Sequence, residues 1–162
     1  FEKEKLKTPL DLVEYSNEHG FDLKLISLIS EINLLDQKYR VSDYQKNKLK
    51  QIEIDKKNQI LIDSLYNQYN SYIGVSMVGK RFDNVMWAVI QHSNPDMMEK
   101  YIPIVHKAVE NNEIKQTPLK MLIDRFYGLK YGYQIFGSQN GFGFKMADNE
   151  TRNKIIKQYD LN

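Results

Sequence analysis

Residues 85–98 read VMWAVIQHSNPDMM and hold the end of one predicted helix, a break, and the start of the next. In the break, Asn94 is the expected N-cap and Pro95 the first residue of the following helix. The preceding apolar helix carries the only Trp of the chain and ends on two polar residues, Gln91 and His92. A polar pair at this place is either an ordinary helix end or part of a site. The functional interpretation of the whole chain depends on which of these is correct.

On both sides of this stretch, apolar residues recur at intervals of three and four, which predicts amphipathic helices. Thr8 is the expected N-cap of the first helix, with Pro9 following and Asp11 in the first turn, and Thr117 caps a later helix in the same way. Pro103 is expected to kink or split its helix. The polar segment 41–57 is unassigned and residues 72–80 form a predicted loop. The predicted helices span about 8–20, 22–36, 58–70, 81–92, 95–109, 117–128 and, after a cap at Asp148 or Asn149, the last residues.

The period changes in YGYQIFGSQNGFGFKM, residues 131–146, which is rich in aromatic residues and glycine. An Asn-Gly pair between apolar runs is a strong hairpin signal, because both turn positions favour positive φ. We therefore predict strands Tyr133–Gln139 and Phe142–Met146, with Gly141 at positive φ and Gly137 in a conformation that other residues resist. The sequence as a whole predicts a mainly α protein: a single helical domain over residues 1–162 with one β-hairpin in its C-terminal half.

The composition is typical of a soluble globular protein: 41% of the 162 residues are hydrophobic, 27% are charged, and the formal net charge is +2. This near balance argues against nucleic-acid binding, which normally needs a concentrated basic face. One basic cluster, YQKNKLKQIEIDKKN at residues 44–58, is interleaved with Glu53 and Asp55. We interpret it as a solvated face.

The absence of cysteine excludes disulfides, thiolate metal sites and cysteine nucleophiles. The three histidines lack metal-binding spacing, so no metal and no cofactor is predicted. No apolar run reaches the length of a membrane span, so we do not expect a transmembrane protein. The sequence begins at Phe1, as a mature chain that has lost a signal or a trimmed chain would. We expect an exported protein, periplasmic or surface-tethered, slightly over a cytoplasmic one.

Several polar residues admit a plain structural explanation when each is taken alone. A His in the last turn of a helix interacts favourably with the helix dipole and donates to a free carbonyl, which would explain His92. Asp124 and Arg125, adjacent on a helix, would ordinarily be solvated. Gln134, Ser138 and Gln139 would fit a surface hairpin.

In order, however, these residues form a pattern: D-Q-x-x-R from Asp36, W-x-x-I-Q-H from Trp87, D-R at Asp124, and Q-x-[YF]-G-[ST]-Q from Gln134. The pattern resembles a bacterial family catalogued as domain of unknown function 6624, over about residues 26–146. The resemblance implies no established activity. Phe136 stands where the family usually has Tyr, which removes a phenolic hydroxyl, and Ser138 stands where Thr is usual.

The resemblance implies that the four segments converge on one polar cluster. In that cluster, His92 is the candidate general base or acid, oriented by Asp124 or Asp36. Arg125 is the candidate clamp for a carboxylate or phosphate. The candidate binding residues are Asp36, Arg40, Trp87, Gln91, Gln134, Ser138 and Gln139.

Three functions remain open for this cluster. The first is a hydrolase or acyl transferase, with Ser138 as a distant candidate nucleophile, although no G-x-S-x-G motif surrounds it. The second is binding of a small polar or anionic ligand or a peptide end. The third is a protein-interaction module in which the cluster is a buried structural network, since 11 Tyr and seven Phe are good interface material.

Overall fold

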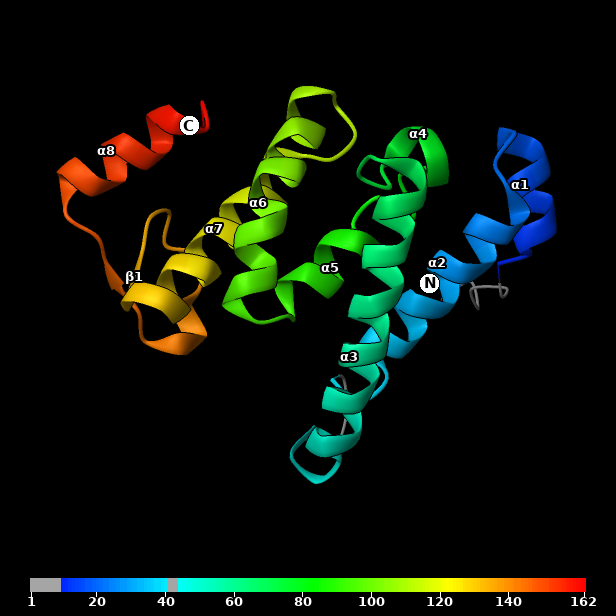
Figure 1. Cartoon of the computed structure of the whole chain (residues 1–162), viewed down its shortest axis with the longest axis horizontal. Coiled ribbons are helices and arrows are strands. Elements are labelled where there is room, and N and C mark those ends of the chain that lie inside the picture. The colour runs from blue at the N-terminus through cyan, green and yellow to red at the C-terminus, as the bar shows by residue number, and fades with distance from the viewer. Residues whose placement is uncertain (1–9, 41–43) are drawn as a thin grey trace, which may run out of the picture.

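The computed structural model describes residues 10–40 and 44–162 (Figure 1). The helices follow one another along an elongated molecule, from α1 and α2 at one end to α8 at the other. The prediction of a mainly α protein is confirmed. The elements are α1 (Leu12–His19), α2 (Leu23–Gln37), α3 (Tyr44–Tyr69), α4 (Val75–Val78), α5 (Val85–Gln91), α6 (Pro95–Glu110), α7 (Gln116–Tyr131), β1 (Tyr133–Gln134), η1 (Asn140–Phe142), β2 (Lys145–Met146) and α8 (Asn149–Gln158).

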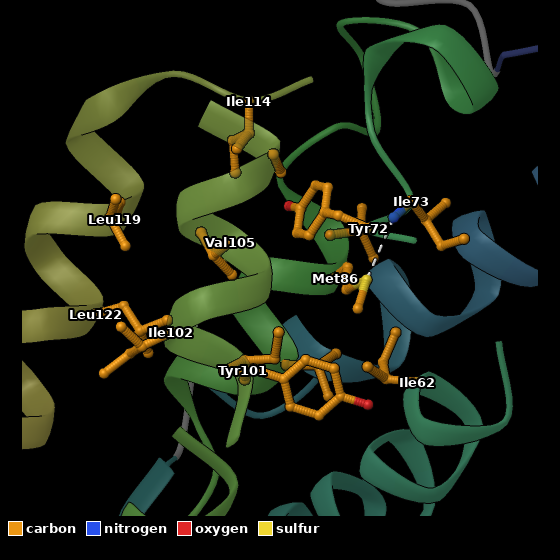
Figure 2. Packing of buried hydrophobic residues seen from close by; sticks show 14 of the residues in the cluster. Ile62, Tyr72, Ile73, Met86, Tyr101, Ile102, Val105, Ile114, Leu119 and Leu122 are labelled. Carbon is orange, nitrogen blue, oxygen red and sulfur yellow. Dashed lines mark hydrogen bonds between the residues drawn. The ribbon is translucent and has the colours of Figure 1, made fainter. Parts of the chain in front are cut away.

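The short helix α5 lies at the centre and contacts α2, α3, α6 and α7. Five of its seven residues are buried, and Figure 2 shows Met86 of α5 beside Ile73, whose backbone N–H lies 3.3 Å from the Met86 sulfur. A helix of seven residues is not stable alone in water, because the cost of nucleation exceeds what so few hydrogen bonds return. Helix α5 therefore forms because its neighbours bury it.

Four predicted helix boundaries are confirmed, each by a specific cap. Gly20 ends α1 in the left-handed conformation at φ 70°. The side chains of Asp22, Asn94 and Asp148 accept hydrogen bonds from backbone N–H groups in the first turns of α2, α6 and α8. These short polar side chains satisfy donors that the helix itself leaves free.

Two helix starts are expected at Thr-Pro pairs: the one at Thr8 lies outside the described residues, and the one at Thr117 is wrong. Asp11 is itself the N-cap of α1 and accepts from Val13 and Glu14, whereas Thr8 and Pro9 lie outside the described residues. Helix α7 begins at Gln116, with Pro118 as its third residue. The first turn of a helix has no intrahelical partners for its N–H groups, so Pro is tolerated there at more than one position.

Helix α6 runs from Pro95 to Glu110 through Pro103, so this proline does not split it. Pro103 cannot donate to the carbonyl of Glu99. Both residues are exposed, so water can satisfy that carbonyl.

Helix α3 extends through residues 44–57, for which the sequence predicts no element, and residues 41–43 lie outside the described residues. Its buried positions are Gln51, Asp55, Asn58, Ile62 and Leu65, one face at helical spacing whose N-terminal half is polar. A search for apolar periodicity does not detect such a face. Among the helices described, α3 included, none is both long and apolar enough to cross a membrane.

The predicted β-hairpin is wrong. Strands β1 and β2 contain two residues each and pair in parallel, Tyr133 with Lys145 and Gln134 with Met146. Residues 140–142 form a 3₁₀ turn, and the positive φ angles fall on Gly137 (82°) and Gly143 (70°) instead of Gly141. The reason is the carboxylate of Asp124 on α7, which accepts hydrogen bonds from backbone N–H groups that a long first strand would have used.

We expect Gly137→Ala to lower the free energy of unfolding by about 1 kcal/mol, because an L-residue is strained at this φ. Gly141→Ala is the matched control. A Cβ at position 141 meets no atom within 4 Å, and the φ of Gly141 is not positive, so this change is expected to be nearly neutral. Urea denaturation of the two variants measures the difference. Equal losses, or a larger loss at position 141, would contradict the turn geometry.

Candidate functional site

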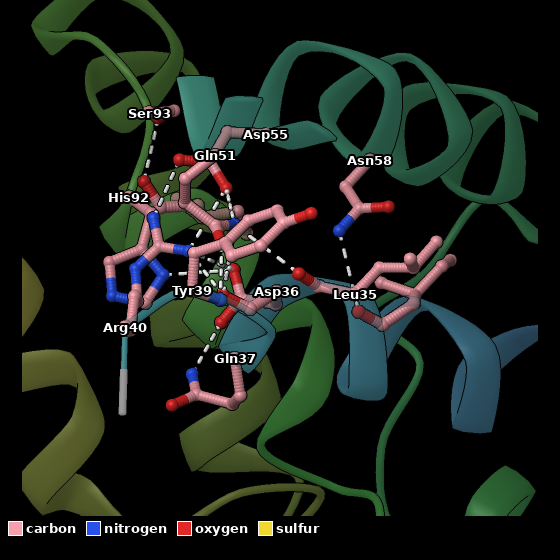
Figure 3. A network of polar contacts seen from close by, with 12 residues as sticks. Leu35, Asp36, Gln37, Tyr39, Arg40, Gln51, Asp55, Asn58, His92 and Ser93 are labelled. Carbon is pink, nitrogen blue, oxygen red and sulfur yellow. Dashed lines mark hydrogen bonds and ion pairs between the residues drawn. The ribbon is translucent and has the colours of Figure 1, made fainter. Parts of the chain in front are cut away.

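The side chain of His92 is joined to that of Asp36 from another helix. Asp36 lies in the last turn of α2 and is 2% exposed, while His92 is the C-cap of α5. The distance from His92 Nδ1 to Asp36 Oδ1 is 2.9 Å (Figure 3). An ionised carboxylate only accepts hydrogen bonds, so Nδ1 carries the proton. Neutral His92 therefore has Nε2 as its basic nitrogen, and no described residue bonds to it.

Asp36 is held ionised by its neighbours. Burial raises the pKa of the Asp36 carboxyl, but the hydrogen bond and charge of His92, the charge of Arg40 and a 2.6 Å hydrogen bond from Gln37 outweigh burial, so the pKa lies below its ordinary value. Arg40 Nη1 lies 3.6 Å from Asp36 Oδ1 and also donates to the Asp36 carbonyl. The pair is thus a carboxylate and an imidazole in fixed orientation, the arrangement that supports general base catalysis.

Arg40 is held in place by a second carboxylate, that of Asp55 on α3. Arg40 donates to both oxygens of Asp55, at 3.0 and 2.6 Å. Gln51 donates to Asp55 at 2.8 Å and to the Asp36 carbonyl at 3.1 Å, and accepts from the N–H of Tyr39 at 2.9 Å (Figure 3). The end of α2 and the middle of α3 are therefore joined by one polar network, which fixes Asp36 behind His92.

Sequence reasoning missed Gln51 and Asp55, and it interpreted their segment as a solvated face. Both side chains are buried. A signal was available: stepping back from Leu65 and Ile62 by helical intervals reaches Asn58, Asp55 and Gln51. A buried helix face that turns polar indicates a network or a site.

His92 and Arg125 line one pocket of about 570 Å³, here called the His92 pocket. Its lining residues are Arg40, Tyr44, Ile52, Asp55, His92, Arg125 and Phe142. Arg125 makes no ion pair within the described residues, its buried Nε has no hydrogen-bond partner, and its guanidinium lies 4.8 Å from the centre of the Phe142 ring. Burial and then the charge of Arg40 lower the pKa of Arg125. An anion bound here would relieve that unfavourable environment.

Asp124, the neighbour of Arg125, binds the backbone of the following loop, and no hydrogen bond or ion pair of the described residues joins it to His92. It is fully buried, and its two oxygens accept from the backbone N–H groups of Ile135, Phe136 and Ser138 and from the Ser138 hydroxyl, at 2.6 to 2.8 Å. Asp124 is therefore neither solvated nor the residue that orients His92, since Asp36 makes that hydrogen bond. The hydrogen bonds that Asp124 accepts replace the strand ladder of the predicted hairpin, because the same N–H groups cannot serve both.

The loop that follows is docked on α7 one turn beyond Arg125. A Cβ on Gly128 would lie 2.1 Å from the Phe144 ring, so only glycine leaves space for that ring. Phe144 stacks on Phe142 at 5.2 Å between ring centres, and Phe142 covers Arg125. Helix α7 thus contacts the loop at two places, Asp124 and Gly128. Arg125 lies between these two residues in the sequence and contacts Phe142 of the same loop.

The remaining predicted residues lie elsewhere. Gln134 accepts from the N–H of Gln139 at 2.9 Å and donates to the Phe144 carbonyl. Both glutamines therefore belong to the loop of residues 132–148 that Asp124 holds, here called the Asp124 loop. Gln91 is buried and donates weakly to the Met121 carbonyl at 3.4 Å. Trp87 lines a different pocket, of about 680 Å³. The structure therefore brings together Asp36, Arg40, His92 and Arg125, and none of the other predicted site residues lines the His92 pocket or makes a side-chain hydrogen bond to these four among the described residues.

Within residues 10–40 and 44–162, no three His, Asp or Glu side chains lie close enough to hold a metal ion. No family model, curated protein or solved structure matches the chain.

We expect Asp36→Asn to lower the free energy of unfolding at pH 7 by about 1–3 kcal/mol, because the amide cannot carry the charge that His92, Arg40 and Gln37 stabilise. The folded pKa of Asp36 is depressed, so its charge contributes fully above the unfolded value of about 3.9 and less as pH falls through the folded value. Urea denaturation between pH 7 and pH 2 should show the difference from wild type shrinking towards low pH. Glu31→Gln, an exposed carboxylate on the same helix, is the control. A difference that grows as pH falls would contradict the assignment.

Proposed function

We propose that the His92 pocket binds a small anionic substrate and that the His92–Asp36 pair moves a proton during its hydrolysis. The observation that carries this proposal is the meeting of an oriented His–Asp pair with an arginine that has no acidic partner in the described chain. The first group supplies a base and the second supplies a counter-charge, and both line one pocket.

In this proposal, Nε2 of His92 accepts a proton from a water molecule, and Asp36 stabilises the imidazolium that forms. Arg125 binds an anionic group and orients the substrate. The described lining residues include no Ser, Thr or Cys, and Ser138 is occupied by Asp124, so water is the proposed nucleophile. Acyl transfer to another acceptor uses the same base and stays within the proposal.

The alternative is a protein-interaction module with a structural polar network. The Asp124 loop supports the network half of this alternative, because its polar groups are buried and bonded to one another. The tyrosines give it little support, since Tyr72 is 4% exposed and Tyr66 and Tyr69 pack against the core. The family resemblance stays a proposal, and it is supported by the hydrogen-bonded grouping of Asp36, Gln37, Arg40 and His92.

The binding half is tested by titrating the protein with acetate and with inorganic phosphate while following the His92 ring by NMR. We expect at least one anion to shift the His92 signals, and Arg125→Met to weaken binding roughly tenfold or more, since a charge-assisted bidentate contact is lost. Met keeps an apolar side chain of similar length, so the fold should tolerate it. Arg81→Met, an exposed arginine outside the pocket, is the control. No response of His92 to either anion would refute the proposal.

The catalytic half is tested with 3-acetoxy-4-nitrobenzoate, an activated ester that carries a carboxylate. We expect wild-type protein to hydrolyse it, and His92→Gln to lower the rate by about 10²-fold or more, which is the usual contribution of a general base. His106→Gln removes a partly exposed histidine outside the pocket and should leave the rate unchanged. Release of the yellow nitrophenol is followed by absorbance. Equal rates for the wild type and His92→Gln would count against a catalytic role of His92.

A further inference from the structure

We infer that the natural ligand of the His92 pocket carries a single carboxylate beside a bulky apolar group, as an N-acylated apolar amino acid or the C-terminal residue of a peptide does. This inference rests on the proposed function and names the substrate class for the same site. Two independent features of the pocket support it: the balance of its charges and the chemistry of its wall.

The charges leave room for one negative charge. Among the described residues, two guanidiniums, Arg40 and Arg125, and two carboxylates, Asp36 and Asp55, lie at this place, and both carboxylates are paired with Arg40. Arg40 is already engaged by both carboxylates, which leaves Arg125 to bind the ligand. A monoanion matches the one guanidinium that has no acidic partner in the described chain. A dianionic phosphate or a polyphosphate would leave an uncompensated negative charge beside two carboxylates.

Part of the pocket lining beside these charges is apolar and accessible. Tyr44, Ile52 and Phe142 are 39%, 37% and 48% exposed, and all three line the pocket. They come from α3 and from the loop docked on α7, so two elements far apart in sequence present apolar surface to one pocket. A volume of about 570 Å³ lies within the ~300–1,000 Å³ of small-molecule sites. A small inorganic anion would leave this apolar surface in water, whereas a large apolar group would bury it.

Both features fit a carboxylate attached to an apolar group, and an amide beside the carboxylate adds chemistry that the site can use. The carboxylate binds Arg125, and the apolar group contacts Ile52 and Phe142. A water that gives a proton to His92 would attack the carbonyl carbon of the amide, and His92 would return that proton to the nitrogen of the leaving amine. Hydrolysis would add this water across the C–N bond and release a carboxylic acid and an amine, so the atoms balance without any further reactant.

The test is a set of NMR titrations of the His92 ring with N-acetyl-L-phenylalanine, N-acetylglycine, N-acetyl-L-phenylalanine amide and inorganic phosphate. We expect N-acetyl-L-phenylalanine to bind at least tenfold more tightly than N-acetylglycine, which lacks the apolar group, and than the amide, which lacks the carboxylate. N-acetyl-Ala-Ala-Phe then distinguishes the sources: tighter binding than N-acetyl-L-phenylalanine indicates a peptide end, and equal or weaker binding indicates the free acylated amino acid.

Two variants of α3 test the wall itself. Ile52→Ser should reduce the preference for N-acetyl-L-phenylalanine over N-acetylglycine several-fold, because part of the apolar wall is lost. Leu49→Ser, which removes an 82% exposed side chain outside the pocket, should leave the preference unchanged. Phosphate binding more tightly than N-acetyl-L-phenylalanine, or the amide binding as well as the acid, would overturn this inference and leave the anion site in place. No response of His92 to any of these compounds would overturn the proposed function as well.

Discussion

The burial of a seven-residue helix is the constraint on which this structure depends. Helix α5 cannot persist alone, yet it contacts four other helices and contributes Val85, Met86, Val89 and Ile90 to the core. A short helix that is buried along its length has little freedom to rotate or slide, since either motion opens voids in a closely packed interior. Its last residue and its C-cap are therefore placed accurately, and the C-cap is His92. The rigidity of the candidate base comes from the apolar packing that precedes it.

Two adjacent residues of α7 divide two tasks between them. Asp124 faces inward and holds the backbone of the following loop, while Arg125 faces the His92 pocket without an acidic partner in the described chain. A carboxylate next to an arginine would ordinarily be expected to neutralise it. Here four hydrogen bonds from the loop occupy the carboxylate, so the guanidinium remains available to a ligand. The structural network and the candidate site are therefore parts of one arrangement, because the loop that Asp124 fixes also carries Phe142 to Arg125.

The sequence predicted those parts that depend on local signals. The cap at Asn94, the last cap at Asp148 or Asn149, the helix start near Asp22 and the end at Gly20 follow from short-range hydrogen bonds and backbone preferences, and the structure has these boundaries, with Asp148 as the last cap. The prediction of a hairpin at Asn140–Gly141 is wrong because the carboxylate of Asp124, on the preceding helix, accepts from the N–H groups that the local pattern assigns to a strand. The polar half of α3 was missed because its buried face is made of Gln51, Asp55 and Asn58, which apolar periodicity does not register.

For the candidate site, the family resemblance implies that Asp36, Arg40, His92 and Arg125 lie together, as they do in the structure, and Asp36 is one of the two carboxylates predicted to orient His92. The sequence did not indicate that the Asp124 loop and Trp87 would lie apart from them. This separation depends on which way each side chain leaves its helix once the helices are packed, and on a loop path that only the tertiary contacts of α7 determine. Spacing along the chain carries no information about either.

The hydrogen bonds of Asp124 also bear on how the loop moves. Residues 135–138 contain no regular secondary structure, and such a segment would ordinarily exchange its amide hydrogens with solvent quickly. The amides of Ile135, Phe136 and Ser138 instead donate to a carboxylate that has no exposed surface. We expect them to exchange mainly when the loop leaves α7, so that the exchange rates of all three report the same opening event. We therefore expect these amides to be protected from exchange like amides of the core, although the stretch has no helix or strand. Phe142, which follows in the same loop, should then stay over Arg125 for as long as the loop stays on α7.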